Sequence, residues 1–273
     1  MIWTLGDRTL DFRERLQIMG ILNTTPDSFF DGGCYLDPER AVERGLELVE
    51  EGADLIDIGG ESTRPPLYGK NAPVSAKEEC RRVLPVIEGL RRHSRIPLSI
   101  DTTKAEVARR ALEAGADIVN DISALRADPQ LASVAAAHRA PVILMHRPPP
   151  APDPADPVAT VRDFLAQRLE VARQAGIESL AVDPGLGFGK SVQGNFALLR
   201  HLEVFAGLGC PVLVGASRKS FIWKTLDLSP AQSLEGSLAV AALCAAQGVQ
   251  ILRVHDVKET VRAVRVAQAV ARA

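Results

Sequence analysis

Short apolar runs recur along the chain, and each ends on a polar residue. The runs are LQIMGILN, LIDIGGE, PLSID, IVND, PVILMH, LAVD, PVLVGASRK and ILRVHD, and their polar ends include Asn23, Glu61, Asp101, Asn120, Asp121, His146, Asp183, Lys219 and His255. Most stretches between consecutive runs show helical periodicity. This alternation predicts an α/β fold, a single (β/α)8 TIM barrel over residues 1–273, with catalytic groups at the carboxyl ends of several strands.

The residues before the first barrel strand predict a small β-hairpin. Its strands are Ile2–Leu5 and Thr9–Phe12, joined by a turn at Gly6 and Asp7. We expect this hairpin to close the bottom of the barrel. A first helix is expected from Asp37-Pro38 to Gly52, because proline is favoured in the first turn of a helix and glycine just after its end.

Several loops on the predicted catalytic face are unusual. Thr24–Asp37 and Ser62–Ala72 are long and rich in small and turn-forming residues, as are many lids that exclude water. Arg147–Pro157 carries six prolines and cannot be helical. After Ser217 we expect a short extra helix over roughly Lys219–Leu226, a feature of many barrels near their phosphate sites.

Charge and cysteine content narrow the class of protein. The formal net charge is −2, and lysines and arginines occur mostly singly or in pairs. This distribution predicts no nucleic-acid surface and no membrane surface, because both would require a basic face. The four cysteines are scattered without a CxxC motif, as is typical of thiols in a reducing compartment. We therefore expect a cytoplasmic enzyme.

Polar residues at three strand ends suit a planar heterocyclic ligand. Asp101, Asn120 and Asp183 would all point into the mouth of the barrel. A carboxylate can accept two parallel N–H bonds from an amidine-like edge, as it does from arginine. The alternative is that each aspartate caps the helix that follows it. The glycine-rich segment DPGLGFGK after Asp183 permits close backbone approach to a flat ligand or phosphate, and a tight turn is its alternative.

The segments SRKS (Ser217–Ser220) and RVHD (Arg253–Asp256) supply cationic groups near the ends of the last two strands. Arg253 and His255 lie two positions apart, so their side chains face the same side of a strand and would bind an anionic leaving group. A structural salt bridge of Arg253 is the alternative. The amide oxygen of Asn23 would suit Mg²⁺, and ordinary loop hydrogen bonding is its alternative.

Seven motifs together resemble one enzyme family over essentially the whole chain. They are NTTPDSFFDGG (23–33), DIGGESTRP (57–65), SID (99–101), IVNDIS (118–123), DPGLGFGK (183–190), GASRKSF (215–221) and RVHDV (253–257). In this order and spacing they are similar to dihydropteroate synthase. That family condenses 6-hydroxymethyl-7,8-dihydropterin diphosphate with p-aminobenzoate, giving 7,8-dihydropteroate and diphosphate in folate biosynthesis, and is the target of sulfonamides.

The resemblance implies a role for each candidate residue. The pterin would be held by Asp101, Asn120, Asp183 and Lys219, with Met145, Phe188 and Gly215 around it. The diphosphate would be held by Asn23, Arg253 and His255, with Mg²⁺ as cofactor and Asn23 as its protein ligand. The p-aminobenzoate would be framed by Phe29, Thr63, Arg64 and Ser217. Asp101, Lys219, Arg64 and His255 would be catalytic.

The resemblance also implies a mechanism and an assembly. The C–O bond to diphosphate would break in a dissociative, SN1-like step, and Asp101 would stabilise the resulting pterin methyl cation. The arylamine would then attack. The family suggests a homodimer that forms through late helices.

The chain departs from the family in the proline-rich segment Arg147–Pro157, whose role is left open. Two other functions would share part of this pattern. A methyltetrahydrofolate–corrinoid methyltransferase would share the pterin grip but would have no use for the cations of SRKS and RVHD. A catalytically silent pterin-binding module would be expected to lack Asn23, Arg64 or His255, and all are present.

Overall fold

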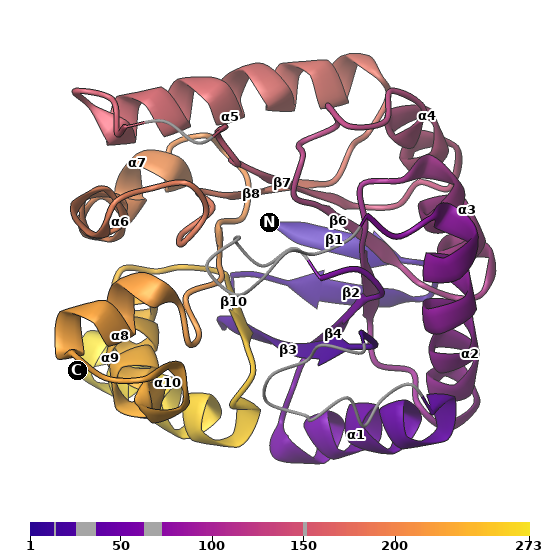
Figure 1. Ribbon diagram of the computed structural model, residues 1–273, viewed down its shortest axis with the longest axis horizontal. Helices are drawn as coiled ribbons and strands as arrows, with labels where there is room; N and C mark the ends of the chain where they lie inside the picture. Colours follow the sequence, from indigo (N-terminus) through magenta and orange to yellow (C-terminus); the bar gives the residue numbers. More distant parts are fainter. Residues whose placement is uncertain (14, 26–36, 63–72, 150–151) are drawn as a thin grey trace.

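Parallel strands form the centre of the molecule and helices surround them, as Figure 1 shows for this computed structural model. The structure describes residues 1–13, 15–25, 37–62, 73–149 and 152–273. The central strands are β3 (Gln17–Asn23), β4 (Leu55–Gly59), β5 (Leu98–Asp101), β6 (Ile118–Asp121), β7 (Val142–Met145), β8 (Leu180–Asp183), β9 (Leu213–Val214) and β10 (Ile251–Val254).

These strands are paired in the order β8-β7-β6-β5-β4-β3-β10-β9. Every pair is parallel. A bridge between Val182 and Val212 joins the two ends of the sheet, and Val182 N donates to Pro211 O at 3.0 Å. The predicted (β/α)8 barrel is confirmed.

The connections between strands are helical, as the periodicity predicts. The helices are α1 (Pro38–Glu51), α2 (Ala76–His93), α3 (Ala105–Glu113), α4 (Gln130–Ala137), α5 (Pro157–Gln174), α6 (Val192–Arg200), α7 (Leu202–Ala206), α8 (Ser220–Leu226), α9 (Leu234–Ala246) and α10 (Val257–Arg272), with a 3-10 turn, η3, at Pro230–Gln232. Asp37 caps α1 by accepting from Glu39 N at 3.0 Å, and Gly52 ends it in a left-handed conformation. Both predicted ends of the first helix are confirmed.

Two predicted boundaries shift. The hairpin strands are β1 (Ile2–Leu5) and β2 (Arg8–Asp11), so the second strand lies one residue earlier than expected. The seventh barrel strand is only two residues long and does not reach Lys219. The chain leaves the sheet at Gly215, and Arg218 adopts a left-handed conformation with φ of 57°. Lys219 is instead the residue before α8, where the extra helix was expected.

The hairpin closes the bottom of the barrel with an apolar layer, as predicted. Its buried side chains are Trp3, Leu5, Leu10 and Phe12, and they pack in one cluster with Met19, Leu55, Ile118, Ile143, Ala181, Leu213 and Ile251 from the barrel strands. Trp3 and Phe12 meet edge to face with ring centroids 5.0 Å apart. The larger remaining core lies between the barrel and its helices.

The apolar layer fixes which residues face the mouth of the barrel. Side chains two positions apart on a strand point to the same face. Moving two residues along each strand from the bottom layer therefore gives the next interior layer, which is Ile21, Asp57, Asn120, Met145, Asp183, Gly215 and Arg253. The interior thus changes from apolar to polar over a single step of two residues.

Within the part of the chain that the structure describes, no helix is long and apolar enough to cross a membrane.

The hairpin plug makes a testable contribution to stability. Trp3 is 3% exposed, so Trp3→Ala should leave a cavity in the bottom layer and lower the free energy of unfolding by about 3–5 kcal/mol. Thr4→Ala on the exposed face of the same strand should change it by less than about 0.5 kcal/mol. Urea unfolding followed by circular dichroism measures both. Equal effects of the two substitutions would contradict the plug.

Candidate active site

A cavity of about 390 Å³ opens among the carboxyl ends of the barrel strands. All predicted site residues that the structure describes line it. They are Asn23, Asp101, Asn120, Met145, Asp183, Phe188, Gly215, Ser217, Lys219, Arg253 and His255. The other three predictions, Phe29, Thr63 and Arg64, lie outside the described residues.

Arg253 organises the floor of this cavity. Its Nε donates to Asp57 Oδ2 at 2.6 Å, and its Nη2 donates to Asp101 Oδ2 at 2.9 Å. Asn120 Nδ2 donates to the same oxygen of Asp57 at 3.0 Å. The salt bridge that was the alternative interpretation of Arg253 is therefore present. It involves two carboxylates from neighbouring strands.

Asp57 is the residue of this network that the sequence analysis missed. It lies inside the apolar run LIDIG and is fully buried. A charge within an apolar strand, two residues along the strand from the bottom layer as Asn120 and Asp183 are on theirs, was a signal that could have revealed it.

Burial makes the carboxyl groups of Asp101 and Asp183 harder to ionise than usual, because it raises their pKa values. Burial, together with the charge of Asp57, raises the pKa of Asp101, although Arg253 opposes the shift. Among the described residues, no hydrogen-bond partner is present for the buried Asp101 Oδ1. Burial also raises the pKa of Asp183 to about 6, opposed by the Gly185 N–H, which donates to Asp183 Oδ1 at 2.7 Å, and by Lys219. These oxygens are well placed to accept N–H donors from a ligand.

An apolar wall and a cation stand above the acidic floor. Lys219 Nζ lies 3.9 Å from the centroid of the Phe188 ring, a cation–π contact. Gly187 permits this approach, because a Cβ at that position would lie 2.8 Å from Lys219 Cδ and the residue has φ of 79°. Met145 lines the same cavity. A flat ring bonded to the floor would thus meet apolar surface and a positive charge.

The turn after β9 supplies the cationic side of the cavity. Arg218 and Lys219 follow Ser217, whose Oγ lies 3.3 Å from His255 N and 3.2 Å from His255 Nδ1. Arg218 forms an ion pair with Asp256. The last two strand ends are joined by these contacts, so the SRKS and RVHD segments form one continuous surface.

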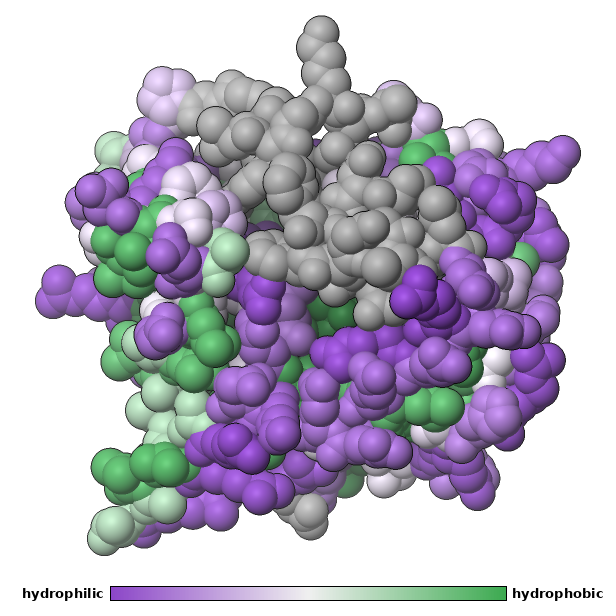
Figure 2. All heavy atoms as spheres, turned by 60° about the horizontal axis from the view of Figure 1, so that its bottom comes forward, coloured by the Kyte–Doolittle hydropathy of each residue, from purple (hydrophilic) through white to green (hydrophobic). Residues whose placement is uncertain are grey.

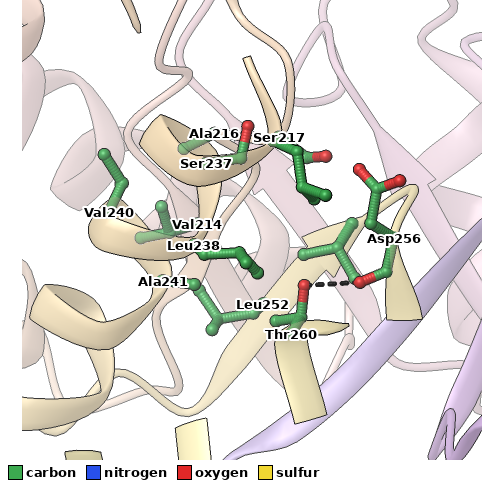
Figure 3. A pocket seen from close by; sticks show the side chains of 12 residues that line it. Val214, Ala216, Ser217, Ser237, Leu238, Val240, Ala241, Leu252, Asp256 and Thr260 are labelled. Atoms are coloured by element: carbon green, nitrogen blue, oxygen red, sulfur yellow. Dashed lines mark hydrogen bonds between the residues drawn. The ribbon is translucent and has the colours of Figure 1, made fainter. Parts of the chain in front are cut away.

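A second, much smaller cavity lies behind this turn. Its volume is about 10 Å³, enough for about one water molecule. Figure 3 shows its walls from β9, β10, α9 and α10, with Ser217, Ser237 and Asp256 at its upper edge and the Thr260 hydroxyl bonded to the Asp256 carbonyl. Ser237 Oγ accepts from Arg218 N at 2.9 Å. These contacts hold the turn that carries Lys219.

Asn23 places an amide oxygen, a ligand type that hard cations accept, in the wall of the cavity. A Cβ at Gly59 would lie 3.6 Å from Asn23 Oδ1 and 3.7 Å from Asp101 Cβ, so the glycine keeps space between the two polar groups. Within the described residues there is no group of three His, Cys, Asp or Glu side chains that could hold a metal. Mg²⁺ is commonly bound by few protein oxygens, with substrate phosphates and waters completing its coordination.

Comparison with known proteins identifies the family. The model of the pterin binding enzyme family matches residues 19–255. Dihydropteroate synthase of Synechocystis is 45% identical over 274 aligned residues, which cover 97% of this chain and 93% of that protein. The chain belongs to the dihydropteroate synthase family.

Solved structures of dihydropteroate synthases share the whole fold. The Xanthomonas albilineans enzyme with 4-aminobenzoic acid is 48% identical with a TM-score of 0.92, and the similarity covers 98% of this chain and 97% of that one. The same organism's enzyme in complex with 7,8-dihydropteroate is 46% identical with a TM-score of 0.89, covering 99% and 98%. The likeness to the dihydropteroate synthases therefore includes the barrel strands that line the cavity.

Ionised Asp101 should destabilise the ligand-free protein. Because its pKa is raised in the folded state, stability should fall as pH rises from the unfolded value near 4 toward the folded one. Asp101→Asn should therefore raise the free energy of unfolding at pH 8 by on the order of 1–2 kcal/mol, with a smaller gain at pH 5. Urea unfolding at both pH values measures this. Asp163→Asn on the exposed face of α5 is the control, and a loss of stability at pH 8 would contradict the assignment.

Proposed function

We propose that this protein is a dihydropteroate synthase that condenses 6-hydroxymethyl-7,8-dihydropterin diphosphate with p-aminobenzoate. The products are 7,8-dihydropteroate and diphosphate. One observation carries the proposal: a single cavity combines a floor of buried carboxylates with a cationic side, in a chain of this family. The ligands named for the Xanthomonas enzymes, 4-aminobenzoic acid and 7,8-dihydropteroate, are a substrate and a product of this reaction.

The floor suits the pterin ring. Asp101 and Asp183 offer acceptors to its N–H groups, and Asn120 offers both an acceptor and a donor. Lys219 would donate to the carbonyl and ring nitrogen of the pterin. Phe188 and Met145 would cover its faces, since both line the cavity beside these polar groups.

The cationic side suits the diphosphate. His255 and Arg253 would bind its oxygens, and Asn23 would be the protein ligand of Mg²⁺. A bound Mg²⁺ would stabilise negative charge on the leaving group. In the free protein Arg253 bonds to Asp57 and Asp101, so it also neutralises part of the acidic floor.

The reaction we propose is dissociative. The C–O bond breaks, its electron pair leaves with the diphosphate, and a methyl cation conjugated to the pterin remains. Asp101 would stabilise this cation, because a fixed charge in a water-poor site acts strongly on developing charge. The arylamine nitrogen of p-aminobenzoate then forms the new C–N bond and loses a proton. Because arylamines are weak bases, no strong general base is required.

The p-aminobenzoate site is proposed from the resemblance. Ser217 lines the cavity near His255 and would frame this substrate. Phe29, Thr63 and Arg64 would complete the frame, with Arg64 in a catalytic role.

We also propose that the protein is a cytoplasmic homodimer. Cys80, Cys210 and Cys244 are free thiols in the core, which agrees with a reducing compartment. Leu243 on α9 is 58% exposed, and Val266 and Val270 on α10 are 67% and 73% exposed. Figure 2 shows apolar surface gathered at its left edge and lower left, the side on which Figure 1 draws these helices.

The proposed activity predicts a strict requirement for two substrates. Purified protein with Mg²⁺ should release diphosphate only when the pterin diphosphate and p-aminobenzoate are both present, and dihydropteroate should appear in equal amount. A coupled diphosphate assay and chromatography measure the two products.

Asp183→Asn should weaken pterin binding by at least about tenfold, because it loses one charge-assisted acceptor. Asp163→Asn is the matched control.

Two outcomes would contradict this function. One is the absence of turnover with both substrates. The other is methyl transfer from methyltetrahydrofolate without any need for diphosphate, which would favour the rival methyltransferase.

The proposed dimer predicts that sedimentation in the analytical ultracentrifuge gives about twice the chain mass of 29.3 kDa. Val266→Glu should shift the protein toward monomer, because it would bury a charge in the interface. Ile2→Glu on β1, also an exposed apolar position, should not. A monomeric wild-type protein at micromolar concentration would argue against the dimer.

A further inference from the structure

Lys190 ends the glycine-rich segment after β8, and its side chain turns toward backbone atoms. Its Nζ donates to Gly185 O at 2.8 Å, to Phe188 O at 3.1 Å and to His146 O at 3.2 Å. An ammonium group has three donors, so each N–H of Lys190 meets one carbonyl oxygen. Lys190 is not among the residues that line the large cavity.

These three carbonyls belong to two different loops. Gly185 and Phe188 follow β8, whereas His146 follows β7. The two loops lie so close that a Cβ at Gly185, whose φ is 69°, would collide with the carbonyl oxygen of His146. His146 is held in turn, since its N–H donates to Asp183 O at 2.9 Å. Lys190 therefore joins the loops at the point where both leave the barrel.

The loop that Lys190 holds carries two groups of the cavity. Gly185 N bonds to the carboxylate of Asp183, and Phe188 presents its ring to Lys219. Phe188 N also donates to Gly185 O at 3.2 Å, so one carbonyl serves both the loop and the ammonium. A loss of the ammonium would release the carbonyl ends of both Gly185 and Phe188.

Two described residues of the proline-rich segment, Pro148 and Asp153, lie next to the loop that carries Lys190. Asp153 accepts from Ser191 N at 3.0 Å, directly after Lys190. A Cβ at Gly189 would lie 3.1 Å from Pro148 Cγ, so Pro148 lies close to the loop at this point. Described residues of the segment whose role the sequence leaves open thus contact the loop on both sides of Lys190, which is partly buried.

We propose that Lys190 is a positioning residue for the pterin, one that fixes Asp183 and Phe188 by binding the carbonyls of Gly185, Phe188 and His146. The inference rests on the proposed function, because it assigns the pterin to this cavity. Lys190 acts through the loop and does not itself touch the ligand.

The environment makes the charge of this lysine sensitive to pH. Burial lowers the pKa of Lys190 to about 7, with Lys219 acting in the same direction and Asp183 and Asp153 opposing it. Burial lowers the pKa of His146 to about 3, so its ring does not titrate in the same range. A neutral amine has two donors for three carbonyls. Positioning should therefore weaken as pH rises through about 7.

The pH range separates this effect from that of the floor carboxylates. Asp183, with a pKa of about 6, gains its charge as pH rises, and so does Asp101. Both changes should strengthen the binding of N–H donors. A decline in pterin affinity between pH 7 and 9 would therefore have the sign expected for Lys190 and the opposite sign to that of the carboxylates.

The test measures the dissociation constant of 6-hydroxymethylpterin by calorimetry at pH 6, 7, 8 and 9. Lys190→Met should weaken binding at pH 6 by about tenfold, because three carbonyls each lose the hydrogen bond from Nζ. The KM for p-aminobenzoate should stay within about twofold. Lys190→Arg keeps a charge at every pH, so it should recover part of the affinity and remove the decline above pH 7. Lys258→Met, at an exposed lysine of α10, should bind like the wild type.

The outcomes are distinct. Wild-type protein that binds no pterin would overturn the proposed function and this inference together. This inference alone would be overturned if Lys190→Met bound pterin as tightly as the wild type does. It would also be overturned if the pterin affinity of the wild type did not decline between pH 7 and 9. If Lys190→Met does not fold, the wild-type and Lys190→Arg pH profiles decide the question. Parallel profiles would then contradict the role of Lys190.

Discussion

The buried ion network of Arg253 with Asp57 and Asp101 is the interaction on which the cavity depends. Three charged groups lie inside the barrel at its change from apolar to polar, and Asn120 shares one of the oxygens. Removing ions from water is costly, and only close pairing with further hydrogen bonds offsets the cost. The pairing is incomplete, because the structure gives no partner for Asp57 Oδ1 or Asp101 Oδ1 among the residues it describes. The floor therefore retains unsatisfied acceptor capacity, as a site for N–H donors requires.

Such a floor needs a rigid frame. Below the floor, the first residues of the strands form an apolar layer that packs against the hairpin. The barrel is closed by the bridge between Val182 and Val212. Closely packed protein interiors resist small displacements, so the carboxylates of Asp57 and Asp101 cannot move apart to relieve their repulsion. Stability gained in the bottom layer and in the core beneath the helices offsets the unfavourable charges at the mouth. The apolar layer that stabilises the fold and the charged layer that destabilises it are thus separated by two residues along each strand.

The sequence predicts the parts of this structure that depend on local periodicity. The alternation of apolar runs and helices predicts the barrel. Seven of the polar residues that end these runs line one cavity, and the resemblance to the family adds Met145, Phe188, Gly215 and Ser217. Asp57 was missed because its partner Arg253 is 196 positions away, and no local pattern links them. The run PVLVGASRK does not continue as a strand to its polar end at Lys219, because the left-handed turn at Arg218 depends on contacts with Ser237 and Asp256 from later elements.

The role of Lys190 also depends on a contact with a distant segment of the chain, which no local pattern predicts. The position of Lys190 at the end of DPGLGFGK predicts no role for its side chain, and the structure turns it toward three backbone carbonyls. The glycines do permit close approach, and what approaches is the chain itself: the His146 carbonyl at Gly185, Lys219 at Gly187 and Pro148 at Gly189. A loop folded so tightly has few conformations left to lose when a ligand arrives, which lowers the entropic cost of binding. In this barrel, then, the contacts of the glycine-rich segment hold Asp183 and Phe188 in place without a ligand, which is how the proposed role of Lys190 would act on binding.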